Sequence, residues 1–132
     1  MKRILVVDDE PDMNLALKII LENNNFKVDS FDDPILALKN FKGNSYDLLI
    51  LDIKMPQMNG TKLYQEIRKI DDKVKVCFLT AGQLYSEMFT DTFQNLDKNQ
   101  FIQKPIENKD LIKKVLTIIS SNCSSAASND VK

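Results

Sequence analysis

Short runs of aliphatic residues alternate along the chain with longer segments in which apolar residues recur every three or four positions. The run at residues 48–51 has no polar position and is too short for a helix, a pattern typical of a strand buried on both faces of a parallel sheet. Residues 26–31 alternate apolar and polar side chains, which predicts an edge strand with one exposed face. The expected strands therefore cover residues 4–7, 26–31, 48–51, 74–79 and 101–103.

The segments between the first three strands are predicted helices. The first begins at Pro11, because proline suits a first helical turn, and ends at the asparagines 23–25, because asparagine tolerates a left-handed cap. The second begins at Pro34, includes Phe41 and ends near Gly43.

Three more helices are predicted in the second half of the chain. Thr61 is expected to cap the third helix, which reaches Ile70. The fourth covers about residues 84–96, where apolar residues keep the helical period although two threonines lower the propensity. The last carries apolar residues at helical spacing over residues 111–119.

Strand and helix thus alternate five times, without any other internal repeat. This order predicts a parallel sheet with helices on both faces, joined by right-handed crossovers. A chain of 132 residues has room for one such domain and its core. We therefore expect a single doubly wound α/β domain over residues 1–119. Residues 120–132 are rich in Ser, Asn and Ala and are predicted to form a disordered tail.

Composition excludes several classes of function. Eighteen basic and nineteen acidic side chains leave a net charge of −1, which argues against direct binding to nucleic acid or to an anionic membrane. The chain lacks an apolar run of membrane-spanning length and a signal peptide pattern, so we expect a cytoplasmic protein. Histidine is absent, which excludes Ser-His-Asp and Cys-His catalysis and histidine-based zinc sites. Cys77, inside an apolar strand pattern, is expected to be a buried reduced thiol.

Polar side chains with possible chemistry follow four of the predicted strands, namely Asp8 and Asp9, Asp52, Thr80 and Lys104. The carboxyl ends of parallel strands meet at one edge of a sheet, where open α/β folds bind ligands. Three carboxylates gathered there repel one another, by about 4 kcal/mol for each pair 4 Å apart at an effective dielectric constant of about 20. A lysine and a divalent cation would offset this repulsion. An oxygen-only site selects Mg²⁺ or Mn²⁺ over zinc.

The same residues carry a family resemblance, through the short motifs at residues 7–9, 51–52, 55–56, 79–81 and 104–105, together with Gly60. In this order and at these spacings they resemble the receiver domain of two-component response regulators, over about residues 2–119. The resemblance implies a flavodoxin-like fold with a parallel five-stranded sheet in the order 2-1-3-4-5.

The resemblance also implies a role for each residue of the site. Asp52 would accept a phosphoryl group from a phosphohistidine on a sensor histidine kinase or a histidine phosphotransfer protein. Asp9, Asp52 and the backbone carbonyl of Lys54 would bind Mg²⁺ directly, and Asp8 would contact it through water. Lys104 would pair with a phosphoryl oxygen.

The implied switch involves Thr80 and Phe101. The hydroxyl of Thr80 would move toward the phosphoryl group, and the ring of Phe101 would turn inward behind it. Phenylalanine lacks a hydroxyl, so the switch would act through packing alone. The peptide bond between Lys104 and Pro105 would be cis, as in the family.

Some positions depart from the family pattern. Residues 84–99 are rich in Met, Phe, Asn and Gln, on the face that receivers present to dimer partners or effectors, so the output and the choice between a monomer and a phosphorylation-dependent homodimer stay open. Lys54 and Gly82 lie two residues beyond Asp52 and Thr80, where they border the phosphoryl group in the family. We therefore expect an altered rate of self-dephosphorylation.

Two alternative functions compete with the phosphoacceptor, which promotes only its own phosphorylation and dephosphorylation and is otherwise no enzyme. One is a phosphatase of the aspartyl-phosphate type, which would need an Asp-x-Asp pair; here Lys54 lies two residues after Asp52, and Pro11 two residues after Asp9. The other is a receiver-fold interaction module that is not phosphorylated. The sequence leaves open the kinase, its signal, the downstream effector and whether the chain is part of a longer protein.

Overall fold

A computed structural model describes residues 2–55, 57–81, 101–104 and 108–120. Its five strands are β1 (Arg3–Val7), β2 (Lys27–Phe31), β3 (Leu48–Asp52), β4 (Lys75–Ala81) and β5 (Phe101–Lys104). The helices are α1 (Pro11–Glu22), α2 (Pro34–Asn40), α3 (Gly60–Arg68) and α5 (Asn108–Ser120). The predicted helix at residues 84–96, residues 121–132 of the predicted tail and the peptide bond to Pro105 lie outside the described residues. Ser120, which the sequence assigned to the tail, is the last residue of α5.

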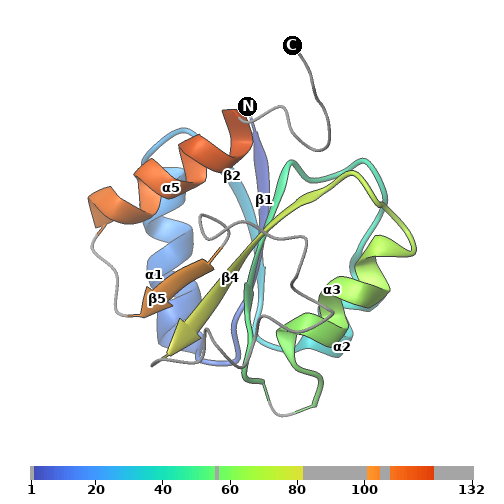
Figure 1. Cartoon of the computed structure of the whole chain (residues 1–132). Helices are drawn as coiled ribbons and strands as arrows, with labels where there is room; N and C mark the ends of the chain where they lie inside the picture. The colour runs from blue at the N-terminus through green and yellow to red at the C-terminus, as the bar shows by residue number, and fades with distance from the viewer. Residues whose placement is uncertain (1, 56, 82–100, 105–107, 121–132) are drawn as a thin grey trace.

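The five strands form one parallel sheet in the order β2-β1-β3-β4-β5. Helices α1 and α5 cover one face, and α2 and α3 cover the other (Figure 1). This arrangement confirms the doubly wound, flavodoxin-like fold and the edge position of β2. The register aligns Val7 of β1 with Leu51 of β3, and Asp52 with Leu79 of β4, so the carboxyl ends of the three central strands lie side by side.

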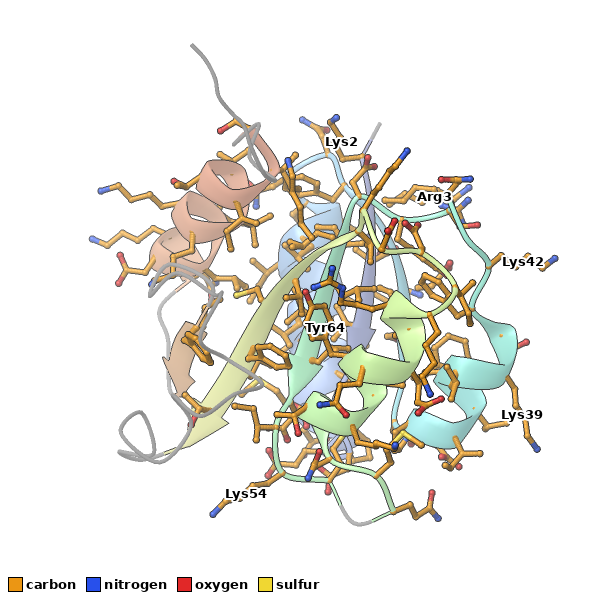
Figure 2. All side chains as sticks on the ribbon, turned by 45° about the vertical axis from the view of Figure 1, so that its right-hand side comes forward. Lys2, Arg3, Lys39, Lys42, Lys54 and Tyr64 are labelled. Carbon is orange, nitrogen blue, oxygen red and sulfur yellow. The ribbon has the colours of Figure 1, made fainter. Side chains whose placement is uncertain are left out.

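Each face of the sheet has its own hydrophobic core. Successive strand residues point to opposite faces, so Leu49 packs toward α2 and α3 whereas Ile50 packs toward α1 and α5. The four aliphatic residues 48–51 of β3 are buried, as their uninterrupted run predicts, and Asp52 at the end of the strand is buried as well. Figure 2 shows Tyr64 of α3 among the side chains of the core that α2 and α3 cover, while Lys39 and Lys54 extend outward.

Cys77 is free, as predicted, and is buried in the core that α1 and α5 cover. Burial raises the pKa of its thiol to about 12. Among the described residues, each helix is too short or too polar to cross a bilayer.

Helix α2 is shorter than predicted. It ends at Asn40, and Phe41 has an extended backbone with φ −75° and ψ 136°. The ring of Phe41 is buried in the core beside α3 and stacks on Tyr46, with ring centroids 5.8 Å apart. The prediction of a helix through Phe41 to near Gly43 was therefore wrong, because this tertiary contact outweighs the local helical pattern.

The predicted start and end of α3 also need correction. Asn59 is the N-cap in place of Thr61, since its Oδ1 accepts a hydrogen bond from the backbone N–H of Lys62 at 2.9 Å. The hydroxyl of Thr61 instead donates to the same oxygen at 2.6 Å. The helix ends at Arg68, and Ile70 lies beyond it with half of its surface exposed.

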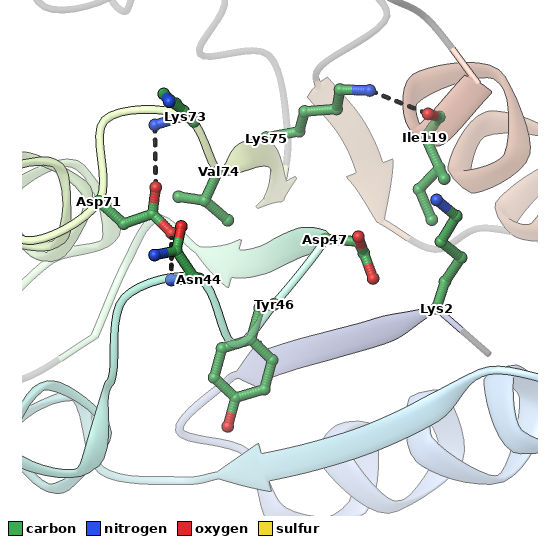
Figure 3. Close-up of a pocket in the computed structure, with 9 residues that line it drawn as sticks. All are labelled: Lys2, Asn44, Tyr46, Asp47, Asp71, Lys73, Val74, Lys75 and Ile119. Atoms are coloured by element: carbon green, nitrogen blue, oxygen red, sulfur yellow. Dashed lines mark hydrogen bonds between the residues drawn. The ribbon is translucent and has the colours of Figure 1, made fainter.

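The amino ends of the central strands border a polar pocket (Figure 3). The ammonium of Lys75 donates to the carbonyl of Ile119 at 2.9 Å and so holds the end of α5. The carboxylate of Asp71 accepts the backbone N–H groups of Asn44 at 2.9 Å and Lys73 at 3.0 Å. These charged groups anchor a helix end and a loop at the end of the sheet opposite to the predicted site.

Candidate functional site

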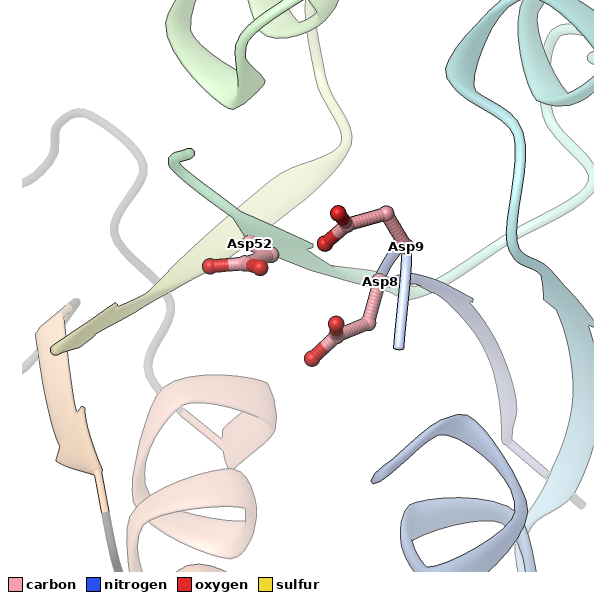
Figure 4. A group of neighbouring side chains, drawn as sticks. All are labelled: Asp8, Asp9 and Asp52. Carbon is pink, nitrogen blue, oxygen red and sulfur yellow. The ribbon is translucent and has the colours of Figure 1, made fainter. Parts of the chain in front are cut away.

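Three carboxylates meet at the carboxyl ends of β1 and β3. Asp8 and Asp9 directly follow β1, and Asp52 is the last residue of β3 (Figure 4). One oxygen from each carboxylate lies within 4.8 Å of the others. Asp8 is fully buried, Asp52 is 6% exposed and Asp9 is half-buried. The structure therefore brings together the three acids that the strand-end pattern placed at one edge of the sheet.

Backbone hydrogen bonds hold the loop that carries Asp8. Its N–H donates to the carbonyl of Phe31 at 3.2 Å, and its Oδ1 accepts the N–H of Glu10 at 2.9 Å. The side-chain amide of Asn14 donates to the carbonyls of Asp8 and Phe31, both at 2.8 Å. Reasoning from the sequence missed Asn14, although one signal was present: it shares a helix face with the core residues Leu17 and Leu21.

The backbone after Asp52 passes very close to the start of α3. The N–H of Ile53 donates to the carbonyl of Leu79 at 3.1 Å, and the N–H of Gly60 donates to the carbonyl of Ile53 at 2.8 Å. A Cβ atom at Gly60 would collide with the carbonyl of Asp52. The sequence pointed to Gly60 through the family resemblance, and the structure shows that this close approach requires glycine. Lys54 lies in the same loop with an exposed side chain.

Thr80 lies next to this cluster in the sheet. It follows Leu79, the β4 residue in register with Asp52, and is 1% exposed. Its buried hydroxyl has no hydrogen-bond partner among the described residues. The backbone of Lys104 ends β5 opposite Ala81, at the same edge of the sheet, but its side chain lies outside the described part of the structure.

Phe101, the predicted switch residue, begins β5 in register with Phe78 and is 2% exposed. The two rings stack with centroids 5.8 Å apart, and Tyr64 of α3 meets Phe78 edge-on at 5.5 Å. Thr80 is two residues beyond Phe78, so both side chains are on the same face of the sheet. Lys114 of α5 donates from Nζ to the carbonyl of Phe101 at 3.2 Å.

The donor atoms of the acidic cluster suit a hard divalent cation. All three side chains offer carboxylate oxygens, the ligand type that Mg²⁺ prefers. Two of the acids are also at least nine-tenths buried, so water screens their mutual repulsion poorly. A cation with two charges would relieve this repulsion, and the buried hydroxyl of Thr80 offers a donor for an anion beside it.

Comparison with known proteins assigns the chain to a family. The family model of the response regulator receiver domain matches residues 4–116. The chain belongs to the response regulator receiver family. Receiver domains are signalling domains of two-component systems. The chain is 36% identical to the chemotaxis protein CheY of Bacillus subtilis over 107 residues, which cover 80% of this chain and 87% of CheY.

Several other relatives of this receiver domain are longer. It is 27–30% identical to several curated transcriptional regulatory proteins, and it spans about half of their length, 49–54%. What those additional regions do is therefore a property of these relatives alone.

Solved structures of receivers share the fold. Response regulator protein TrrA from Thermotoga maritima, solved in complex with Mg²⁺-BeF, is 37% identical with a TM-score of 0.70, over 89% of this chain and 99% of TrrA. A structure of the histidine kinase ThkA in complex with TrrA contains a chain that is 32% identical with a TM-score of 0.72, over 91% of this chain and 100% of that chain.

Proposed function

We propose that this receiver domain accepts a phosphoryl group on Asp52 from a phosphohistidine of a sensor histidine kinase or a histidine phosphotransfer protein, with Mg²⁺ or Mn²⁺ as cofactor. The observation that carries the proposal is the meeting of Asp8, Asp9 and Asp52 within 4.8 Å at the carboxyl edge of the sheet. The related TrrA has been solved with Mg²⁺-BeF and with a histidine kinase, which supports both the cofactor and the type of partner.

Phosphoryl transfer requires a nucleophile and positive charge to neutralise the phosphoryl oxygens and the carboxylates. An oxygen of the Asp52 carboxylate attacks phosphorus, the O–P bond forms, and the P–N bond breaks with its electron pair returning to the imidazole. When bound, Mg²⁺ supplies positive charge beside the phosphoryl oxygens. By resemblance to the family, Asp9, Asp52 and the backbone carbonyl of Lys54 would hold it, with Asp8 acting through water.

Two further side chains would meet the transferred group. Lys104 would pair with one phosphoryl oxygen, and the Thr80 hydroxyl would donate to another. The buried hydroxyl has no partner among the described residues, so a new acceptor nearby would favour a conformation that reaches it. Phe101 and Phe78 pack on the same face of the sheet as Thr80, and movement of Thr80 would change the space available to Phe101. The conformational switch then operates through packing.

Membership of the receiver family favours this signalling role over the phosphatase alternative. The output of the domain is the step after phosphorylation: which effector it contacts, and whether it acts as a monomer or as a phosphorylation-dependent homodimer. The family is found both as nearly the whole of CheY and as about half of longer transcriptional regulatory proteins, so either kind of output is compatible with this domain.

Mass spectrometry of the intact protein tests the proposal. Incubation with a small phosphodonor and Mg²⁺ should add one phosphoryl group to the wild-type chain, and a chelator should prevent the addition. Asp52→Asn should stay unmodified, whereas Asp72→Asn, which changes an exposed acid outside the cluster, should react like the wild type. Equal labelling of Asp52→Asn would refute the assignment. Lack of both labelling and any response to beryllofluoride would favour the interaction module that is not phosphorylated.

A further inference from the structure

Asn14 is a buried polar residue on the core-facing side of α1. It is only 6% exposed and shares that side of the helix with Leu17 and Leu21. Asparagine has low helix propensity, and burial of its amide is unfavourable unless the amide is hydrogen-bonded. An apolar side chain could be buried at this position at a lower free-energy cost, which suggests that the hydrogen bonds of the amide have a role.

Both N–H groups of this amide are used at the carboxyl edge of the sheet. They donate to the carbonyl of Asp8, at the end of β1, and to the carbonyl of Phe31, at the end of β2, each at 2.8 Å. The Phe31 carbonyl also accepts the N–H of Asp8 at 3.2 Å. The Oδ1 of Asn14 is buried without a hydrogen-bond partner among the described residues, so within this part of the chain the side chain acts through its two donors.

These contacts act on the acidic cluster through the backbone. The peptide group is planar, so the direction of the Asp8 carbonyl sets the orientation of the peptide that leads into Asp9. The N–H of Glu10 donates to Asp8 Oδ1 at 2.9 Å, which fixes the carboxylate of Asp8 from the other side of the turn. Asn14 therefore holds the one peptide that joins two of the three acids.

We propose that Asn14 is a positioning residue of the receiver site, which sets the placement of Asp8 and Asp9 and thereby the affinity for the divalent cation. The inference rests on the proposed function and extends it to a residue of α1 that does not itself belong to the acidic cluster. Hydrogen-bonding partners that orient metal ligands typically change metal affinity by about 10–100-fold when they are removed.

Calorimetric titration of the full chain with Mg²⁺ measures this effect. Asn14→Leu keeps a similar volume and removes both donors, and we expect its Mg²⁺ affinity to fall by about 10-fold or more. Asn40→Leu is the matched control, because the Asn40 amide donates to the carbonyl of Leu36 on an exposed part of α2. Leu17→Ala, in the same helix, controls for a general loss of stability. Both controls should keep the wild-type affinity.

The outcomes separate the two proposals. A wild-type chain that does not bind Mg²⁺ contradicts the proposed function. If the wild type binds and Asn14→Leu binds equally well, or if Leu17→Ala weakens binding as much as Asn14→Leu, the positioning role is wrong. Should Asn14→Leu not fold, Asn14→Ala admits water to the two carbonyls, and an unchanged affinity in that variant overturns the inference as well. Asn14→Gln, which retains the amide, should recover part of the affinity.

Discussion

Removal of the Thr80 hydroxyl should stabilise the resting protein while it abolishes the switch. Thr80 is 1% exposed, and its Oγ1 accepts and donates no hydrogen bond among the described residues. Thr80→Val replaces this hydroxyl by a methyl group of nearly the same shape. The substitution therefore removes a buried polar group without creating a cavity.

The size of the effect follows from the cost of burying a hydroxyl that has no partner among the described residues. A buried polar group without a partner costs about 1–3 kcal/mol relative to its hydrated state. We expect Thr80→Val to raise the free energy of unfolding by about 1–2 kcal/mol. For a domain of this size, each kcal/mol shifts the midpoint of thermal unfolding by roughly 3–5 °C.

Urea unfolding followed by circular dichroism measures the change. The midpoint concentration should rise with an unchanged slope, since the same surface is exposed on unfolding. Thr117→Val is the control, because its exposed hydroxyl donates to the carbonyl of Lys113 within α5, and its effect should stay within about 0.5 kcal/mol. A loss of about 1 kcal/mol or more in Thr80→Val would mean that the hydroxyl is hydrogen-bonded in the native state and would refute the reasoning.

Three further predictions concern other parts of the molecule. Gly60→Ala places a Cβ against the carbonyl of Asp52, so the thermal midpoint should fall and calorimetry should show weaker Mg²⁺ binding. The control is Gly43→Ala, whose Cβ would meet its nearest atom at 3.4 Å and which should retain Mg²⁺ binding. Burial and the Asp29 carboxylate raise the pKa of Tyr46 from 10.0 to about 12. The protonated phenol therefore stabilises the fold below pH 10, and this contribution is lost as the pH rises through 12. In urea unfolding, Tyr46→Phe should lose less stability than the wild type between pH 10 and pH 12. The Cys77 thiol, whose pKa burial raises to about 12, should resist alkylation near neutral pH in the folded protein and react after addition of urea, and rapid native labelling would contradict its burial.

The local pattern of apolar residues was enough to locate the strands in the sequence. Residues 48–51 of β3 are all buried and all aliphatic, because a central strand covered by helices on both faces has no solvated side. The acids could also be located before the structure was known, since Asp8, Asp9 and Asp52 directly follow such runs and parallel strands end at one edge. That Asp8 and Asp52 would be buried, with Asp9 only half-buried, was not contained in the pattern.

The boundaries of the helices depended on contacts that no local pattern contains. Phe41 has helical spacing, yet its ring stacks on Tyr46 and the chain leaves the helix before it. Thr61 and Asn59 both suit an N-cap, and the backbone geometry selected Asn59. Lys114 resembles any surface lysine in the sequence, but the packing of α5 places its ammonium against the carbonyl of Phe101.

The sequence by itself therefore determined the order of elements, the parallel sheet and the edge at which the acids lie, because hydrophobic runs and their polar ends are properties of neighbouring residues. Only the tertiary structure decided that the Asn14 amide holds the ends of β1 and β2, and that Gly60 must leave room for the backbone of Asp52. These contacts join segments that become neighbours only when the crossovers and the strand register are set, and backbone carbonyls, which every residue carries, leave no trace in the sequence.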